Sequence, residues 1–135
     1  MRPLLAYLIA PLAGVAVFAL VWGLPLLPAV AGQPGSVARV GAAAAGILVP
    51  AFVLALALSL AVMFAVRARF GGAWWPAAAG GVVLYLAVFA LLALRVGFAT
   101  VFTGPFWLAG LVAGGVVHGL AFRALVGPGR AANAN

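Results

Sequence analysis

The chain contains no Asp or Glu in 135 residues, and four long apolar stretches fill almost all of it. Charged residues make up 5% of the sequence and hydrophobic residues 69%. A compact protein in water needs a polar shell, and this composition has too few polar side chains to cover one. We therefore expect an all-α polytopic membrane protein whose outer side chains contact lipid.

The apolar stretches are long enough to be membrane spans. A spanning helix needs about 20 apolar residues to cross ~30 Å of hydrocarbon. Four stretches meet this requirement, with short loops of Arg, Gly and Pro between them: residues 4–24, 40–66, 77–101 and 106–126. They predict a single four-helix transmembrane domain over residues 1–135, with a short polar tail at 127–135. A transmembrane β-barrel would instead show short segments of alternating apolar and polar residues, so we exclude it.

Two details of the spans carry structural predictions. Pro50 lies inside the second span and cannot donate a hydrogen bond to the carbonyl of Gly46, which predicts a kink there. The turn expected around Gly104 makes the third and fourth spans an antiparallel hairpin.

The first span has an alternative interpretation. Arg2, the apolar segment and the small residues 29–31 resemble a secretory signal with its cleavage site. The apolar stretch is longer than the core of about 7–15 residues that signals have, so we favour an uncleaved span. Cleavage would leave three spans.

The arginines predict the orientation in the membrane. With both termini in the cytoplasm, five arginines lie on the inner side: Arg2, Arg67, Arg69, Arg123 and Arg130. Only Arg39 and Arg95 lie on the outer side. Because cytoplasmic loops are enriched in basic residues, the N-in/C-in arrangement is favoured. Arg2, Arg67, Arg69 and Arg123 are also candidates for contact with anionic lipid headgroups. The heavy use of Ala, Gly, Val and Arg, without Lys, is typical of a GC-rich bacterial genome and suggests the inner membrane.

The fourth span contains two GxxxG pairs, Gly110/Gly114 and Gly115/Gly119. Small residues four apart let another backbone approach closely, and we favour packing within the chain over a contact between chains. His118 lies on the same helix face. It is a candidate for gating, proton relay or binding of an anionic headgroup. The alternative, which we favour, is a neutral imidazole hydrogen-bonded to a backbone carbonyl, Ser59 or Tyr85.

Arg95 is the second candidate functional residue. In a span that ends at Val101 its guanidinium starts ~9 Å inside the boundary, where an unpaired charge is costly. The chain has no carboxylate side chain to pair with it. We favour a side chain that reaches the outer headgroups. The alternatives are a helix that ends near Arg95, or an anion or a partner's carboxylate bound there.

Catalysis, cofactors and metals are not expected. The sequence has one His and no Cys, Asp or Glu, so it offers no ligand set for a metal. Ser59 lies mid-membrane without a glycine elbow, so a Ser59/His118 catalytic dyad is disfavoured. The arginines are single rather than clustered into a nucleic-acid-binding patch.

Two functional hypotheses follow for this non-enzyme. The first is an accessory or assembly subunit that acts through helix–helix contacts, with membrane lipids and a larger membrane protein as partners. The second is a small homo-oligomeric channel, transporter or lipid-translocating protein for an anionic or neutral solute, in which Arg95 and His118 contact the solute. Small four-span multidrug transporters are disfavoured because they depend on a membrane-embedded glutamate, which this chain lacks.

Overall fold

The computed structural model describes residues 2–30, 32–98 and 106–127, and all its long elements are helices. Helix α1 (Arg2–Gly23) leads into the short elements η1 (Leu24–Leu26) and α2 (Leu27–Val30). Three long helices follow: α3 (Ser36–Phe70), α4 (Trp74–Val96) and α6 (Trp107–Val126). Among the described residues, four helical segments are long and apolar enough to cross a membrane, which indicates an integral membrane protein.

The observed helices differ from the expected spans mainly at their ends. Helix α3 has 35 residues and runs past both ends of the expected 40–66 segment, without interruption at Pro50. Helix α4 begins at Trp74 rather than residue 77, with Pro76 in its first turn. The expected turn at residues 103–105, Ala31 of the signal-like site and the tail from residue 128 lie outside the described residues.

Helix α4 ends before the expected end of the third span, and Val101 itself lies outside the described residues. The helix stops at Val96, where Gly97 adopts a φ of +95° and donates its N–H to the carbonyl of Ala93 over 2.9 Å. A residue with a side chain rarely adopts such a φ, whereas glycine does so readily. Gly97 therefore ends α4, and Arg95 lies in the last turn of this helix.

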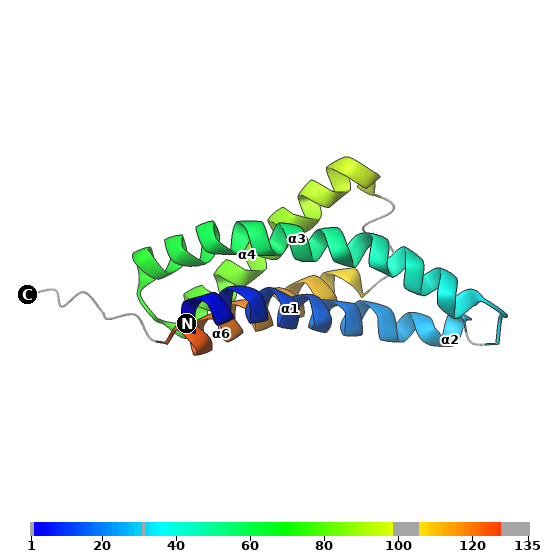
Figure 1. Cartoon of the computed structure of the whole chain (residues 1–135), viewed down its shortest axis with the longest axis horizontal. Helices are drawn as coiled ribbons and strands as arrows, with labels where there is room; N and C mark the ends of the chain where they lie inside the picture. Colours follow the sequence, from blue (N-terminus) through cyan, green and yellow to red (C-terminus); the bar gives the residue numbers. More distant parts are fainter. Residues whose placement is uncertain (1, 31, 99–105, 128–135) are drawn as a thin grey trace, which may run out of the picture.

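The long helices lie side by side, with α4 crossing the others obliquely (Figure 1). The contacts fix the relative direction of α4 and α6. Gly119 faces Ala77, and Gly115 faces Gly81, so the chain runs forward along α4 as it runs backward along α6. The two helices are therefore antiparallel, as expected from the sequence.

Glycines on α6 bring its backbone against two other helices. A Cβ placed on Gly119 would meet the carbonyl oxygen of Ala77 and lie 3.1 Å from the Cα of Ala78, both on α4. A Cβ on Gly114 would lie 2.7 Å from the carbonyl oxygen of Gly14 on α1. These distances leave no room for a side chain, so the close approach of α6 depends on these glycines.

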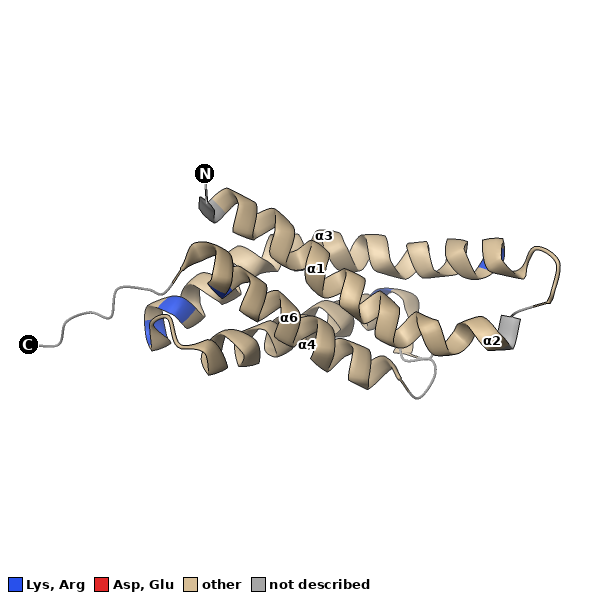
Figure 2. Cartoon of the chain, turned by 90° about the horizontal axis from the view of Figure 1, so that it is seen from below, with Lys and Arg blue, Asp and Glu red and all other residues tan. Residues whose placement is uncertain are grey.

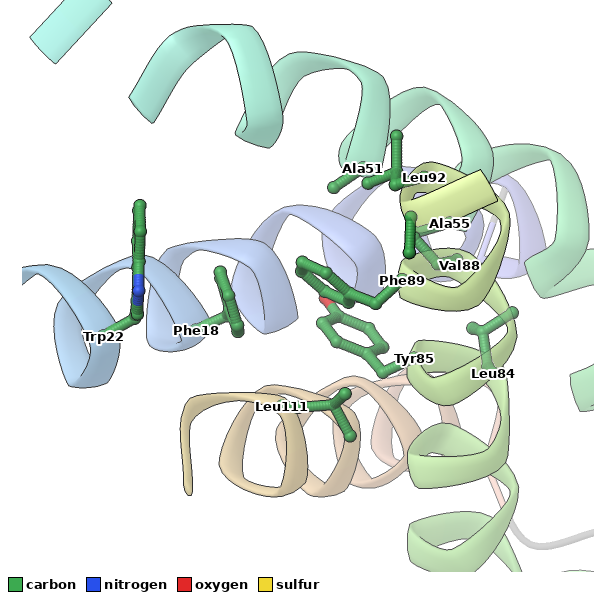
Figure 3. Packing of buried hydrophobic residues seen from close by; sticks show 11 residues of the cluster. Phe18, Trp22, Ala51, Ala55, Leu84, Tyr85, Val88, Phe89, Leu92 and Leu111 are labelled. Atoms are coloured by element: carbon green, nitrogen blue, oxygen red, sulfur yellow. The ribbon is translucent and has the colours of Figure 1, made fainter. Parts of the chain in front are cut away.

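Aromatic side chains pack between the helices (Figure 3). Phe18 of α1 packs on Phe89 of α4, with ring centroids 4.5 Å apart, and stacks on Trp22 at 5.9 Å. Leu111 of α6 and Ala55 of α3 complete this cluster. A second cluster, at the other end of the helices, gathers around Met63 and Phe122. Two apolar clusters thus lie along the length of the helices.

The glycine contacts predict an asymmetry between α6 and α3. The change Gly119→Ala should lower the free energy of unfolding by about 1–3 kcal/mol, because the added methyl group overlaps the α4 backbone. The control Gly41→Ala on α3 meets nothing within 4 Å. It should leave stability unchanged or raise it by up to ~1 kcal/mol, since alanine is the better helix former. Reversible unfolding in mixed micelles, followed by circular dichroism, measures both, and equal losses would contradict the assigned packing.

Candidate functional site

A buried hydrogen bond joins two polar side chains at the centre of the helices. The Ser59 hydroxyl on α3 lies 2.9 Å from Nε2 of His118 on α6. Both side chains are fully buried, at 0% exposure. Among the partners considered for His118 from the sequence, Ser59 is therefore the one found. The bond connects residues 59 positions apart and ties α3 to α6.

Residues of the other two long helices surround this bond. The Tyr85 ring of α4 meets the His118 ring edge-on, with centroids 5.7 Å apart and an interplanar angle of 78°. The Tyr85 hydroxyl donates to the carbonyl of Pro11 on α1 over 3.4 Å. We call Pro11, Ser59, Tyr85 and His118 the four-helix polar cluster, because each helix contributes one residue.

Gly14 makes room for the polar cluster. A Cβ on Gly14 would meet the Tyr85 hydroxyl and lie 2.9 Å from the His118 Cβ. Any side chain there would displace either the tyrosine or the histidine. The sequence signal for this role was the Ala10/Gly14 pair, a weaker form of the small-residue spacing on α6.

The second ring nitrogen of His118, Nδ1, is buried without a hydrogen-bond partner among the described residues. In a neutral imidazole one nitrogen donates and the other accepts, so the direction of the Ser59 bond sets the state of Nδ1. If the serine donates, Nδ1 carries an unpaired N–H; if the serine accepts, Nδ1 is an unpaired acceptor. Either state costs about 1–3 kcal/mol relative to a satisfied group.

A hydrogen-bonded serine and histidine also occur in hydrolases, where the serine is the nucleophile and the histidine is its general base. In such sites a third group orients the imidazole through the nitrogen that faces away from the serine. Here that nitrogen is unpartnered within the described part of the chain, and the sequence contains no acidic residue. The pair is also enclosed by helices. These features favour a structural tie over a catalytic dyad.

Arg95 lies apart from the polar cluster, exposed in the last turn of α4. In Figure 1 this end of α4 projects beyond α3. A cation in the last turn of a helix is stabilised by the partial negative charge of the terminal carbonyls. Arg95 and His118 are therefore two separate locations rather than one site.

Three of the remaining candidate arginines gather at the opposite end of α4 (Figure 2). Arg67 and Arg69 lie in the last turn of α3, and Arg123 lies in the last turn of α6. The Arg123 Nε donates to the carbonyl of Gly72 over 2.6 Å. This bond attaches the end of α6 to the turn between α3 and α4. The Arg2 side chain lies outside the described residues.

The polar cluster predicts energetic coupling between Ser59 and His118. The changes Ser59→Ala and His118→Leu should each lower the free energy of unfolding. The double variant should lower it by less than the sum of the two single losses. A coupling of about 0.5–1.5 kcal/mol is expected, the range of hydrogen bonds between membrane helices. A double-mutant cycle of unfolding in micelles measures it.

The control for this cycle is Tyr85→Phe. It keeps the ring contact with His118 and removes only the longer bond to Pro11. The change Tyr85→Phe should lower the free energy of unfolding by less than about 0.5 kcal/mol, because a hydrogen bond of that length is weak. Additive losses for Ser59 and His118 would show that the two side chains do not interact.

Comparisons with models of protein families, with curated proteins and with solved structures give no match to this chain.

Proposed function

We propose that this chain is a non-catalytic integral membrane protein that serves as an accessory or assembly subunit through helix–helix contacts. The observation that carries this proposal is an open groove between α1 and α3 with exposed small residues beside it. The groove differs from the rest of the helix packing because no part of the described chain fills it.

The groove measures about 310 Å³ and has an entirely apolar lining. Helix α1 contributes Leu12, Val15, Ala16 and Ala19, and helix α3 contributes Leu48, Val49 and Phe52. In a bilayer such a groove is filled by acyl chains or by the side chains of another helix. A row of side chains from a partner helix fits an apolar groove of this kind.

The first half of α3 favours a helix as the occupant. Gly41 and Gly46 flank a run of four alanines, and a Cβ on either glycine would meet nothing within 4 Å. Glycine within a helix costs about 0.5–1 kcal/mol relative to alanine, and no contact inside the described chain offsets that cost here. The backbone of a partner helix packed against these glycines would offset that cost, as close backbone packing does at the glycines of α6.

Arg95 supports this proposal less than the sequence suggested. The partner hypothesis drew on a cation deep within a long span, whereas Arg95 lies in the last turn of α4, which ends at Val96. Lipid headgroups at the helix end are enough to satisfy an exposed arginine. The groove and the α3 glycines therefore carry the argument.

We further propose that both termini face the cytoplasm of a bacterial cell and that α3 bends at Pro50. The inner-side excess of arginine supports the orientation, and the missing proline N–H supports the bend.

The orientation can be tested by labelling. Because the chain has no native cysteine, single-cysteine variants can be labelled without background. An impermeant thiol reagent should reach Gln33→Cys from outside the cell and Gly72→Cys only after the inner face is opened.

The groove predicts a specific companion protein. Tagged protein extracted gently from its own membrane should carry a companion at fixed stoichiometry, seen by native mass spectrometry. The change Ala16→Phe fills the groove and should reduce the companion by about tenfold, the effect of ~1.4 kcal/mol of lost contact.

The matched control is Ala57→Phe, which adds the same bulk at another exposed alanine, on α3 outside the groove. It should leave recovery of the companion unchanged. Equal loss for both variants, or no companion at all, would contradict the accessory-subunit proposal.

The buried polar cluster favours a second candidate function. A small homo-oligomeric channel, transporter or lipid-translocating protein would use His118, whose Nδ1 is unpaired among the described residues, as a contact for an anionic or neutral solute. Purified protein in liposomes should then pass a small anion or a labelled lipid, with a rate changed by His118→Leu or Arg95→Gln. A homo-oligomer without flux would count against this candidate.

A further inference from the structure

We propose that the cleft between Arg67 and Arg123 binds a phosphate group, supplied either by an anionic lipid headgroup or by a soluble phosphate compound. This site is independent of the proposed partner function, because it lies at the end of the helices and shares no residue with the α1/α3 groove. The shape of the cleft, the hydrogen-bond donors around it and the absence of acidic side chains from the sequence all favour a phosphate ligand.

The cleft lies where the ends of α3 and α6 meet the turn that leads into α4. Met63 and Phe122 provide apolar walls, Gly71 and Gly72 provide backbone, and Arg67 and Arg123 provide the charges. The volume of the cleft is about 20 Å³. This is room for about one water, so a phosphate oxygen enters while the rest of the ligand stays outside.

Arg123 is held in place by its own hydrogen bond. Its Nε donates to the Gly72 carbonyl over 2.6 Å, which fixes the plane of the guanidinium at the cleft. Its two terminal nitrogens have no acceptor within the described part of the chain. Arginine presents such nitrogens as a fork that matches two phosphate oxygens. A fixed guanidinium with free terminal donors suits phosphate better than a mobile lysine would.

The charge around the cleft lacks compensation from side chains. Arg67 and Arg123 both line it, and no Asp or Glu exists anywhere in the sequence to pair with them. Two cations that share one cleft repel each other, and an anion between them reverses that interaction. The terminal carbonyls of α3 and α6 stabilise each arginine in part. They leave both guanidinium forks available to a ligand.

The position of the cleft matches that of headgroup phosphates. Trp74 and Trp75 follow it directly in the chain and are exposed, as is typical of tryptophans at the membrane–water interface. Arg69 lies on the same end of α3 and is also exposed, yet it does not line the cleft. Arg67 lines the cleft and Arg69 does not. A comparison of these two arginines therefore distinguishes binding at a defined site from general attraction to an anionic surface.

The test uses the full-length protein in a neutral detergent, titrated with phosphatidylglycerol, with phosphatidylcholine or with inorganic phosphate. Native mass spectrometry counts the bound lipids, and inorganic phosphate is added as a competitor. One phosphatidylglycerol per chain should bind in preference to phosphatidylcholine. Arg67→Gln and Arg123→Gln should each weaken that binding by about tenfold or more, whereas Arg69→Gln should change it far less.

The source of the phosphate follows from the competitor. Displacement of the lipid by inorganic phosphate, or binding of inorganic phosphate alone, assigns the site to soluble phosphate compounds. Binding of the lipid without such competition assigns it to headgroups. An equal loss of phosphatidylglycerol binding in Arg67→Gln and Arg69→Gln would overturn the proposal. So would a failure of the protein to bind either phosphatidylglycerol or inorganic phosphate. Because Arg67→Gln leaves the Arg123–Gly72 bond intact, it keeps the test valid if Arg123→Gln fails to fold.

Discussion

The contact of the α6 backbone with α1 and α4 is the constraint on which the other features depend. Lipid tails are as apolar as the side chains of these helices, so burial of apolar surface gives little drive for helix association in a membrane. Close packing supplies it instead, and it requires glycine where backbones touch. Gly114 and Gly119 of α6 meet Gly14 and Ala77 in this way. The contact on two sides makes α6 the helix around which α1 and α4 assemble.

This packing explains why polar groups lie in the centre. The glycines that bring α1 and α4 against α6 also bring Tyr85 onto His118, and the Ser59 hydroxyl then joins α3 to the same place. Helix α3 has the smallest buried share of the four spanning helices. It is therefore held by fewer contacts and keeps a free face. Helix α3 lines one side of the groove and carries the unpacked glycines. The proposed partner surface therefore includes the least buried of the long helices.

Apolar length alone predicts the four spans, because crossing a bilayer needs a continuous apolar run, and a break in the run is visible in the sequence. Helix ends are harder, since they depend on single residues. For the third span we favoured an end at Val101 and kept an end near Arg95 as the alternative, and α4 ends at Val96. An arginine followed by a glycine within two residues is a recognisable stop signal that favours the alternative.

The site was accessible from the sequence only in part. Helical spacing places His118 on the glycine face of α6, and only a few polar side chains are available to it, so Ser59 is one of few options. The bond between Arg123 and Gly72 and the groove along α1 join residues far apart in the sequence. Such contacts depend on how the helices cross, which no local pattern records.

The most direct measurement is solid-state NMR of the labelled protein in lipid bilayers, with carbon–carbon correlations through space. The close approach of α6 predicts cross-peaks from Gly119 to Ala77 and Ala78, and from Gly114 to Gly14. These pairs are far apart in the sequence, so no single helix produces such signals. Their absence from spectra that show the contacts within each helix would contradict the central role of α6.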